Sequence, residues 1–406
     1  MSLSLDGAQL ISRLKQLGAT GRDETGQLTR LAASDADRAG RDLLCEWMKD
    51  AGLTIEIDRI GNIFGIWTPD GVSGDPLLIG SHIDTVINAG IYDGCYGVLA
   101  GLAVIEAMQA NKFAPSRPLA VAAFTNEEGV RYAPDMMGSL VAAGGLSVEA
   151  ALASKGIDGT ILGQELERIG YAGLREPGFL KPHAYIELHI EQGPILEAES
   201  IPVGVVESLQ GISWQQVTIG GKANHAGTTP MSMRHDAGVA AAMVITLLYD
   251  LARKTPSAVA TVGTMAFEPN AINVIPSSAR FTVDMRNPDE VCLRAQEDSL
   301  TNFLQTLTDN GYTVQVERLA RFEPVIFSPH IVKAIEDSIS ERQLKSRRMT
   351  SGAGHDAQMI ARIAPAAMIF VPSQSGISHN PAEFTSESDL ISGAHILLDT
   401  VLKLCR

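Results

Sequence analysis

Five polar residues in the first third of the chain are of the types that carry out hydrolytic chemistry. His82 is followed by Asp84 and then by Asp93, and the adjacent Glu127 and Glu128 come further along. Imidazole and carboxylate groups are common ligands of centres in which two divalent ions activate water, and a carboxylate that binds no metal can serve as a base. These residue types therefore predict metal-dependent hydrolysis.

Short apolar runs precede these polar residues. Residues 77–79 and 119–124 are continuous apolar segments, which are typical of buried parallel strands. The polar residues then lie where the strands end, at the edge where open α/β sheets bind ligands. Adjacent glutamates are usually a solvated surface, but these two directly follow a buried strand. Neighbouring residues on an extended chain point in opposite directions, so one glutamate can bind metal while the other faces the substrate. The glutamate that binds no metal is then left to act as a general base.

Two later histidines have similar settings. His189 lies in a strand pattern that begins at residue 184, and His379 lies in a polar loop after the apolar run 366–371. A single histidine is more often a hydrogen-bonded residue than a ligand, and the chain has four for which that interpretation serves: His183, His235, His330 and His395. For His82, His189 and His379 the surrounding motifs favour metal binding.

Taken in order, the motifs resemble the hydantoinase/carbamoylase branch of the M20 metallopeptidase-like family. The resemblance extends from about His82 to Glu383 and includes four further segments: 221–230 around His225, 270–276 around Asn273, 284–286 and 351–357. Seven linked motifs are far more specific than any one of them. Peptidase relatives commonly have an acidic residue where this chain has His189, and the difference favours the carbamoylase branch.

The resemblance implies five metal ligands and two divalent ions per subunit. Asp93 is expected to bridge the ions, with His82 and His189 on one of them and Glu128 and His379 on the other. Because Glu128 is a ligand in this set, we assign Glu127 as the general base. Asp84, two residues after His82, should orient the His82 ring as a hydrogen-bond acceptor. Imidazole and carboxylate ligands suit manganese, zinc, cobalt or nickel, so the identity of the metal stays open.

The resemblance also implies a substrate clamp. Arg286, whose planar guanidinium fits a carboxylate bidentately, and Asn273 are expected to bind the substrate carboxylate. His225 is expected at the carbonyl oxygen that becomes negative in the transition state, and Gln192 at the ureido group. The alternative for Arg286 is a surface salt bridge, which its place at the end of a predicted strand disfavours.

Three other residues near these motifs each allow two interpretations. His355 and Asp356 form a polar loop that either lines the pocket or begins a helix with Asp356 in its first turn. Cys95 follows Asp93 closely, but we interpret it as a small packing residue rather than a ligand. The cysteines are widely spaced and form no C-x-x-C pair, so they predict neither a disulfide framework nor a zinc ribbon.

Composition limits the class of protein. With 406 residues, 45% of them hydrophobic and 19% charged, the chain is expected to form a globular protein with two domains. A net charge of -15 argues against nucleic acid or an anionic membrane as partner, although one local arginine is enough for an anionic substrate. The sequence has neither a signal-peptide pattern nor an apolar run of membrane-spanning length, so we expect a cytoplasmic protein.

The order of predicted elements indicates an α/β fold with an insertion. Residues 211–321 follow the order strand, helix, two strands, helix, strand, which is ferredoxin-like. Residues 1–210 and 322–406 then form one discontinuous catalytic α/β domain that binds the metals. The resemblance implies that the inserted α+β domain is a lid that also forms a homodimer.

These expectations together predict a binuclear metal-dependent amidohydrolase. Its substrate would be an N-carbamoyl-L-amino acid, released as amino acid, carbon dioxide and ammonia. Allantoate and β-ureido acids present the same carboxylate and ureido groups and stay open as substrates. An aminoacylase or dipeptidase is disfavoured by His189, and a catalytically inactive binding protein by the retention of all five ligands and Glu127.

Overall fold

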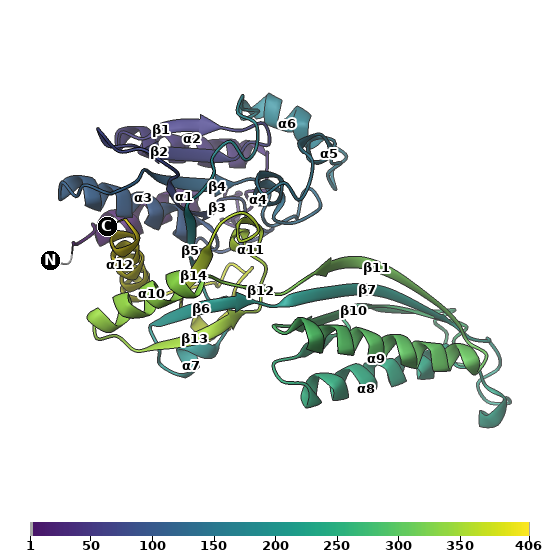
Figure 1. Cartoon of the computed structure of the whole chain (residues 1–406). Coiled ribbons are helices and arrows are strands. Elements are labelled where there is room, and N and C mark those ends of the chain that lie inside the picture. The colour runs from purple at the N-terminus through teal and green to yellow at the C-terminus, as the bar shows by residue number, and fades with distance from the viewer. Residues whose placement is uncertain (1–2, 406) are drawn as a thin grey trace. The chain divides into compact units, whose positions relative to one another are not determined.

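The computed structural model describes residues 3–405, which divide into two compact units (Figure 1). Unit 1 combines the chain up to Glu207 with the chain from Phe327 onward, and unit 2 is Ser208–Ile326. Unit 1 is therefore discontinuous in sequence, and the predicted insert, 211–321, lies inside unit 2. Among the described residues, no helix is long and apolar enough to cross a membrane.

Four parallel strands form the centre of the unit 1 sheet. Their order is β4-β3-β5-β14, and their bounds are Leu119–Phe124, Leu77–His82, Ala184–Ile190 and Ala366–Val371. Every residue of these strands is buried. Burial on both faces explains why they are almost continuously apolar in sequence. The strand predicted at 366–371 is confirmed with the same bounds.

Antiparallel strands extend this sheet on both sides. On one side are β2 (Ile63–Trp67) and β1 (Thr54–Ile57), and on the other is β6 (Val203–Leu209), which also pairs with β13 (Ser346–Ser351). The last two residues of β6 belong to unit 2 and pair there with β12 (Val325–Ile326). We expected a largely parallel sheet in the catalytic α/β domain, and these antiparallel strands were not predicted. β13, with the sequence SRRMTS, has no apolar run that could have revealed it.

A nearly fully buried helix, α3 (Cys95–Ala110), contacts β3, β4 and β5 and begins two residues after Asp93. α1 (Gly7–Ala19) and α12 (Glu387–Leu404) contact α3, and α10 (Pro329–Glu341) contacts α12 and β14. The remaining helices are α2 (Asp35–Asp50), α4 (Met137–Ala142), α5 (Val148–Leu152), α6 (Leu162–Ile169), α7 (Ile195–Ala198), α11 (Asp356–Ile360) and the short 3-10 helix η2 (Gln374–Gly376). Side-chain N-caps define several starts, such as Ser34 for α2 and Ser386 for α12.

Unit 2 has an antiparallel sheet and two helices. The strands β7 (Gly211–Gly220), β8 (Val259–Thr261), β10 (Ser278–Asn287) and β11 (Thr313–Phe322) have the order β11-β7-β10-β8, and β9 (Met265–Glu268) also pairs with β10. α8 (Ala237–Lys254) follows β7, and α9 (Glu290–Asp309) follows β10; a 3-10 helix, η1 (Met231–Met233), precedes α8. Burial alternates along β10, and its inward side chains share one core with α8 and α9. This is the predicted ferredoxin-like order with one difference: three strands rather than two lie between α8 and α9, because β8 and β9 each pair with a different part of β10.

Candidate metal centre

The predicted ligands of unit 1 converge at the carboxyl ends of the central strands. His82 is the last residue of β3, Glu127 and Glu128 follow β4, and His189 is the penultimate residue of β5. The segment after β14 leads to His379. Because these strands are parallel, their carboxyl ends share one edge of the sheet, which is where α/β proteins bind ligands.

Asp93 lies between two groups of possible ligands. Its Oδ1 is 3.1 Å from His189 Nε2 and 3.6 Å from His82 Nε2. Its Oδ2 is 3.2 Å from His379 Nε2, and that nitrogen is 3.4 Å from Glu128 Oε2. In each group, His82–Asp93–His189 and Asp93–Glu128–His379, the ligand atoms lie within 4.8 Å of one another. The structure thus brings together the residues that the sequence analysis assigned to each ion, with Asp93 common to both.

The rings of His82 and His189 are oriented for metal binding through Nε2. Nδ1 of His82 is 2.9 Å from the carbonyl oxygen of Asp84, and Nδ1 of His189 is 2.9 Å from the carbonyl oxygen of Ile190. A carbonyl oxygen only accepts, so Nδ1 carries the proton in both rings. Nε2 of each ring therefore faces Asp93. In the metal-free protein a proton on Nε2 donates to this carboxylate, and loss of that proton makes the nitrogen available as a ligand.

Asp84 acts differently from the expectation that its carboxylate orients His82. Its Oδ1 is 3.8 Å from His82 Nδ1, beyond hydrogen-bond range, and the main-chain carbonyl makes that contact instead. The carboxylate accepts from the backbone N–H groups of Glu127, at 3.2 Å, and Glu128, at 3.3 Å. Asp84 therefore holds the histidine with its main chain and the glutamate pair with its side chain.

The charges of the centre call for further positive charge. Burial raises the pKa of Glu128 to about 8, with the nearby charge of Asp93 as the next cause, and burial raises the pKa of Glu127 well above its usual range. Burial opposes ionisation of Asp93 too, but hydrogen bonds from His189, His379 and His82 hold its pKa well below the usual range. Among the described residues, buried Glu128 Oε1 has no hydrogen-bond partner. Divalent cations would satisfy this donor set and compensate its charge.

The backbone is strained around the centre. Asn126, Gln192 and His379 have φ values of 57°, 56° and 53°, in the left-handed region that residues other than glycine seldom adopt. Such conformations persist where the surrounding structure enforces them, which is common at functional sites. Gly94 also has a positive φ, 64°, and a Cβ there would lie 2.4 Å from His82 Nε2, so no other residue fits after Asp93.

Gln192 belongs to the same cluster. Its Nε2 donates to Asp93 Oδ2 at 2.8 Å and lies 3.4 Å from His379 Nε2. Its own Oε1 is buried without a hydrogen-bond partner among residues 3–405. The contact with the ureido group stays a prediction, although an unused acceptor beside the metal ligands suits it.

The predicted clamp residues lie in unit 2. His225 and Asn273 are exposed, and their segments are joined by a bond from Ala226 N–H to the Asn273 carbonyl oxygen at 3.0 Å. Arg286 donates to Asp284, with Nη2 at 2.9 Å from Oδ2, and lies over the ring of Trp214. The salt bridge that was the alternative interpretation is thus present, and the roles in substrate binding stay predictions.

The three residues that allowed two interpretations, His355, Asp356 and Cys95, have defined contacts in the structure. Asp356 is the first residue of α11, as the helix alternative predicted, and its Oδ1 accepts from Ser139 Oγ at 2.5 Å. The His355 ring lies against that of His189, with 4.5 Å between centroids, and burial holds the pKa of His355 well below its usual range. Cys95 is buried, accepts from Arg30 at 3.1 Å and belongs to neither group of ligands.

Two buried residues of the centre were missed in the sequence analysis. Glu187, two residues before His189, accepts from Ser81 Oγ at 2.6 Å and from Ala357 N–H at 2.8 Å. Glu383 accepts from the backbone of the Asp93 segment. A signal existed for both, since each carboxylate lies within four residues of a histidine that the motifs favoured.

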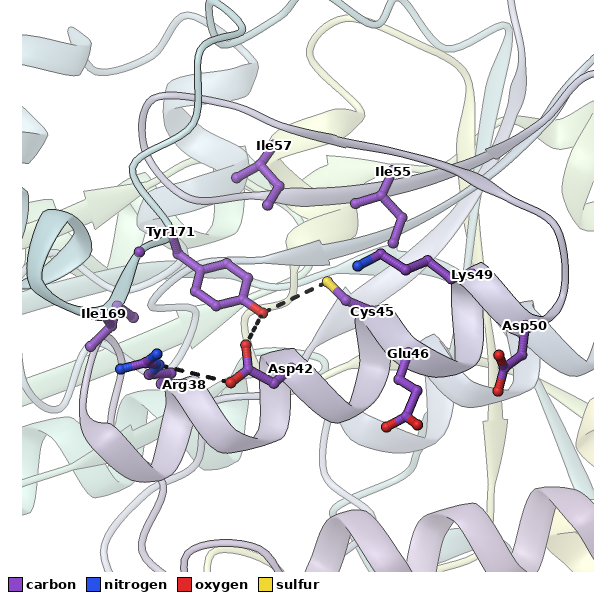
Figure 2. A pocket seen from close by; sticks show the side chains of 11 residues that line it. Arg38, Asp42, Cys45, Glu46, Lys49, Asp50, Ile55, Ile57, Ile169 and Tyr171 are labelled. Carbon is purple, nitrogen blue, oxygen red and sulfur yellow. Dashed lines mark hydrogen bonds and ion pairs between the residues drawn. The ribbon is translucent and has the colours of Figure 1, made fainter.

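A separate cleft of unit 1 has a different lining. It measures about 500 Å³ and lies between α2, β1 and the chain after α6 (Figure 2). The Tyr171 hydroxyl donates to Asp42 at 2.8 Å and lies 3.8 Å from the Cys45 sulfur, while Ile55 and Ile57 supply an apolar wall. None of the predicted catalytic, substrate-binding or metal-binding residues lines this cleft.

Similarity to known proteins agrees with this architecture. Residues 78–403 match peptidase family M20/M25/M40. An N-carbamoyl-L-amino-acid amidohydrolase of Rhizobium meliloti is 39% identical, over 97% of this chain and 95% of that protein. An allantoate amidohydrolase of Bacillus subtilis is 33% identical over 96% of each. The crystal structure of an amidase of the hydantoinase/carbamoylase family from Burkholderia multivorans superposes with a TM-score of 0.95 at 40% identity, covering 100% of this chain and 99% of that one.

A match over most of the chain, together with full-length relatives above 30% identity, establishes the relationship that the motifs suggested. The arrangement of the ligands at the ends of parallel strands is consistent with it. The chain belongs to peptidase family M20/M25/M40, in its hydantoinase/carbamoylase branch.

Proposed function

We propose that this protein is an amidohydrolase that uses two divalent ions to hydrolyse the ureido C–N bond of N-carbamoyl-L-amino acids. The observation that carries the proposal is the placement of Asp93 between two sets of ligands, with Glu127 beside His82 of the first set. The full-length similarity to an enzyme named for this substrate class supports it. The products would be the amino acid, carbon dioxide and ammonia.

In this proposal His82 and His189 would hold one ion and Glu128 and His379 the other, and Asp93 would contribute to both sets of ligands. Ions bound in this way supply a Lewis acid for the ureido carbonyl and a water of lowered pKa. The donor set of imidazoles and carboxylates accommodates manganese, zinc, cobalt or nickel. His82 and His189 retain their orientation through the carbonyl oxygens that accept from Nδ1.

Glu127 is the proposed general base. Its Oε2 lies 3.3 Å from His82 Nε2, so it sits directly beside a ligand without belonging to either group. Its backbone is held by the Asp84 carboxylate, which limits how far the side chain can move. From this position Glu127 can take a proton from the attacking water and deliver it to the departing nitrogen.

The clamp residues of unit 2 would bind the remainder of the substrate. Arg286 would exchange Asp284 for the substrate carboxylate, since the same guanidinium face serves either partner, and Asn273 would assist it. His225 would donate to the carbonyl oxygen as negative charge develops there. Gln192, already next to Asp93, would contact the ureido group.

Unit 2 is also proposed to form a homodimer and to close over the centre as a lid. The outward side of α8 exposes apolar side chains that unit 2 leaves uncovered: Val239, Met243, Ile245 and Tyr249 are 43%, 52%, 38% and 58% exposed. Clustered exposed apolar residues mark interaction surfaces more often than isolated ones do. Charge substitutions on this side, such as Met243→Glu, should convert a dimer to monomer in analytical ultracentrifugation.

Allantoate is the second candidate substrate, because a relative of nearly the same length is an allantoate amidohydrolase. It too combines a carboxylate with ureido groups, so the same clamp could bind it. Ammonia release should be measured with N-carbamoyl-methionine, N-carbamoyl-β-alanine and allantoate at matched concentrations. The proposal predicts the highest kcat/KM for the first, and clearly faster turnover of allantoate would replace it with the alternative.

A further inference from the structure

Glu383 is a buried carboxylate that belongs to neither group of metal ligands. It is 6% exposed, and its Oε1 accepts from the backbone N–H groups of Tyr92, at 3.1 Å, and Asp93, at 3.3 Å. Its Oε2 accepts from Ser378 Oγ at 2.9 Å. One side chain thus joins the loop that carries Asp93 to the loop that carries His379.

Ser378 extends this contact to the carboxylate of Asp93. Its Oγ lies 3.2 Å from Asp93 Oδ2 and 3.3 Å from Gln192 Nε2. The hydroxyl has one proton and can donate to only one of the two carboxylates at a time. Glu383 therefore competes with Asp93 for this proton while it fixes the serine beside Asp93 Oδ2, the oxygen that faces His379.

The Glu383 side chain packs closely against Gly90. A Cβ added at Gly90 would lie 2.2 Å from Glu383 Oε1 and 2.5 Å from its Cβ, so the side chain rests directly on the main chain before Asp93. Burial, and next the charge of Asp93, raise the pKa of Glu383 to about 7. The Glu383 carboxylate thus lies where burial disfavours its negative charge. Its side-chain hydrogen bonds are with the backbone of Tyr92 and Asp93 and with Ser378.

We propose that Glu383 is a positioning residue for the metal centre. It fixes the main chain at Asp93 and, through Ser378, the direction of the Asp93 carboxylate, so that Oδ1 faces His82 and His189 while Oδ2 faces His379. Without this support the carboxylate could rotate and satisfy only one group of ligands. The inference rests on the proposed two-metal function.

The test compares three variants with the wild type. Glu383→Ala removes all three hydrogen bonds. Glu383→Gln keeps the three contacts: its amide oxygen accepts from the two backbone N–H groups, and its NH2 group donates to Ser378, which reverses the direction of that bond. Gly90→Ala retains the glutamate but displaces it. Glu106→Ala is the matched control, since Glu106 also forms a partly buried contact, with Arg13, on the part of α3 remote from Asp93.

Two quantities should be measured: the dissociation constants and stoichiometry of Mn²⁺ by titration calorimetry on metal-free protein, and kcat and KM. Glu383→Ala and Gly90→Ala should each weaken binding of at least one ion about 10- to 100-fold, the usual effect of removing a partner of a metal ligand. Both should lower kcat more than they change KM. Glu383→Gln and Glu106→Ala should bind both ions within about threefold of the wild type.

The results separate positioning from a general effect on stability. A folded Glu383→Ala protein with a lowered melting temperature but wild-type Mn²⁺ affinity and kcat would overturn the inference. If Glu383→Ala does not fold, Gly90→Ala decides the question by the same measurements. A wild-type protein that binds no divalent ion would instead refute the proposed function itself, which keeps the two failures distinct.

Discussion

The metal centre of unit 1 is held by buried partners, whereas the predicted clamp of unit 2 is open to solvent. Asp93 contacts three imidazoles, and the His82 ring is fixed by a main-chain carbonyl. His225 and Asn273 are exposed, and Arg286 is engaged by a neighbour on its own strand. The first region is preorganised, whereas the proposed clamp of the second would have to rearrange to bind substrate. Changes of the metal ligands should therefore weaken metal binding and turnover together, and changes in the clamp should affect turnover or substrate binding without weakening metal binding.

Removal of metal should have the largest effect. Chelation followed by dialysis is expected to abolish turnover, because the ligands of the centre can activate water only through the ions they hold. Readdition of manganese, cobalt or zinc should restore activity at least in part. Elemental analysis must accompany the assay, and full activity in metal-free protein would refute the proposed chemistry.

The glutamate pair provides a sharper test within the centre. Glu127→Gln should retain both ions and lose about 10²- to 10⁴-fold in kcat, the range for a positioned general base. Glu128→Gln should instead weaken metal binding, because Glu128 Oε2 lies 3.4 Å from His379 Nε2 in the second group. Calorimetry and steady-state kinetics on both variants distinguish the roles, and near-normal kcat in Glu127→Gln would exclude it as the base.

His225→Ala should leave metal affinity unchanged and reduce kcat about 10²- to 10³-fold, as expected for loss of one oxyanion donor.

The His225→Ala variant also shows which subunit supplies the clamp. Glu127→Gln and His225→Ala subunits should be mixed, dissociated and reassociated, since random pairing makes about half of the dimers mixed.

If unit 2 of one subunit completes the site of the other, each mixed dimer contains one site with both substitutions and one with neither. Roughly a quarter of wild-type activity should then return, by the same pairing statistics. If each subunit completes its own site, every site has one substitution and no activity returns. Mass spectrometry must confirm the mixed dimers before a negative result is accepted.

The parts of this structure that could be predicted are those determined locally. The strand at 366–371 is a continuous apolar run, and the residues of the centre follow such runs or lie near their ends. The polar strand β13 lacked this signal. Contacts between distant segments were also out of reach. The sequence placed Asp84 near His82 but could not reveal that its carbonyl makes the contact, nor that Glu383 reaches Asp93 across 290 positions of the chain.

The pH dependence of metal binding tests the centre without any substitution. The hydrogen bond with Asp93 raises the pKa of His379 to about 9, and burial raises that of Glu128 to about 8. A ligand must lose its proton to bind metal, so between about pH 6 and 8 the apparent affinity should rise at least tenfold per pH unit.

The metal-free protein should show the opposite trend. The pKa of His379 is higher in the folded chain than its ordinary value of 6.5, so its pairing with Asp93 stabilises the fold below about pH 6.5 and is lost as the pH rises through 9. The melting temperature of the metal-free protein should therefore fall from pH 6 to 9. Over the same range, the rise in melting temperature on addition of Mn²⁺ should become larger. His379→Gln should flatten both trends, whereas His330→Gln, on exposed α10 surface, should preserve them. If melting temperature changes with pH equally in His379→Gln and in the wild type, His379 is not the group whose proton the metal displaces.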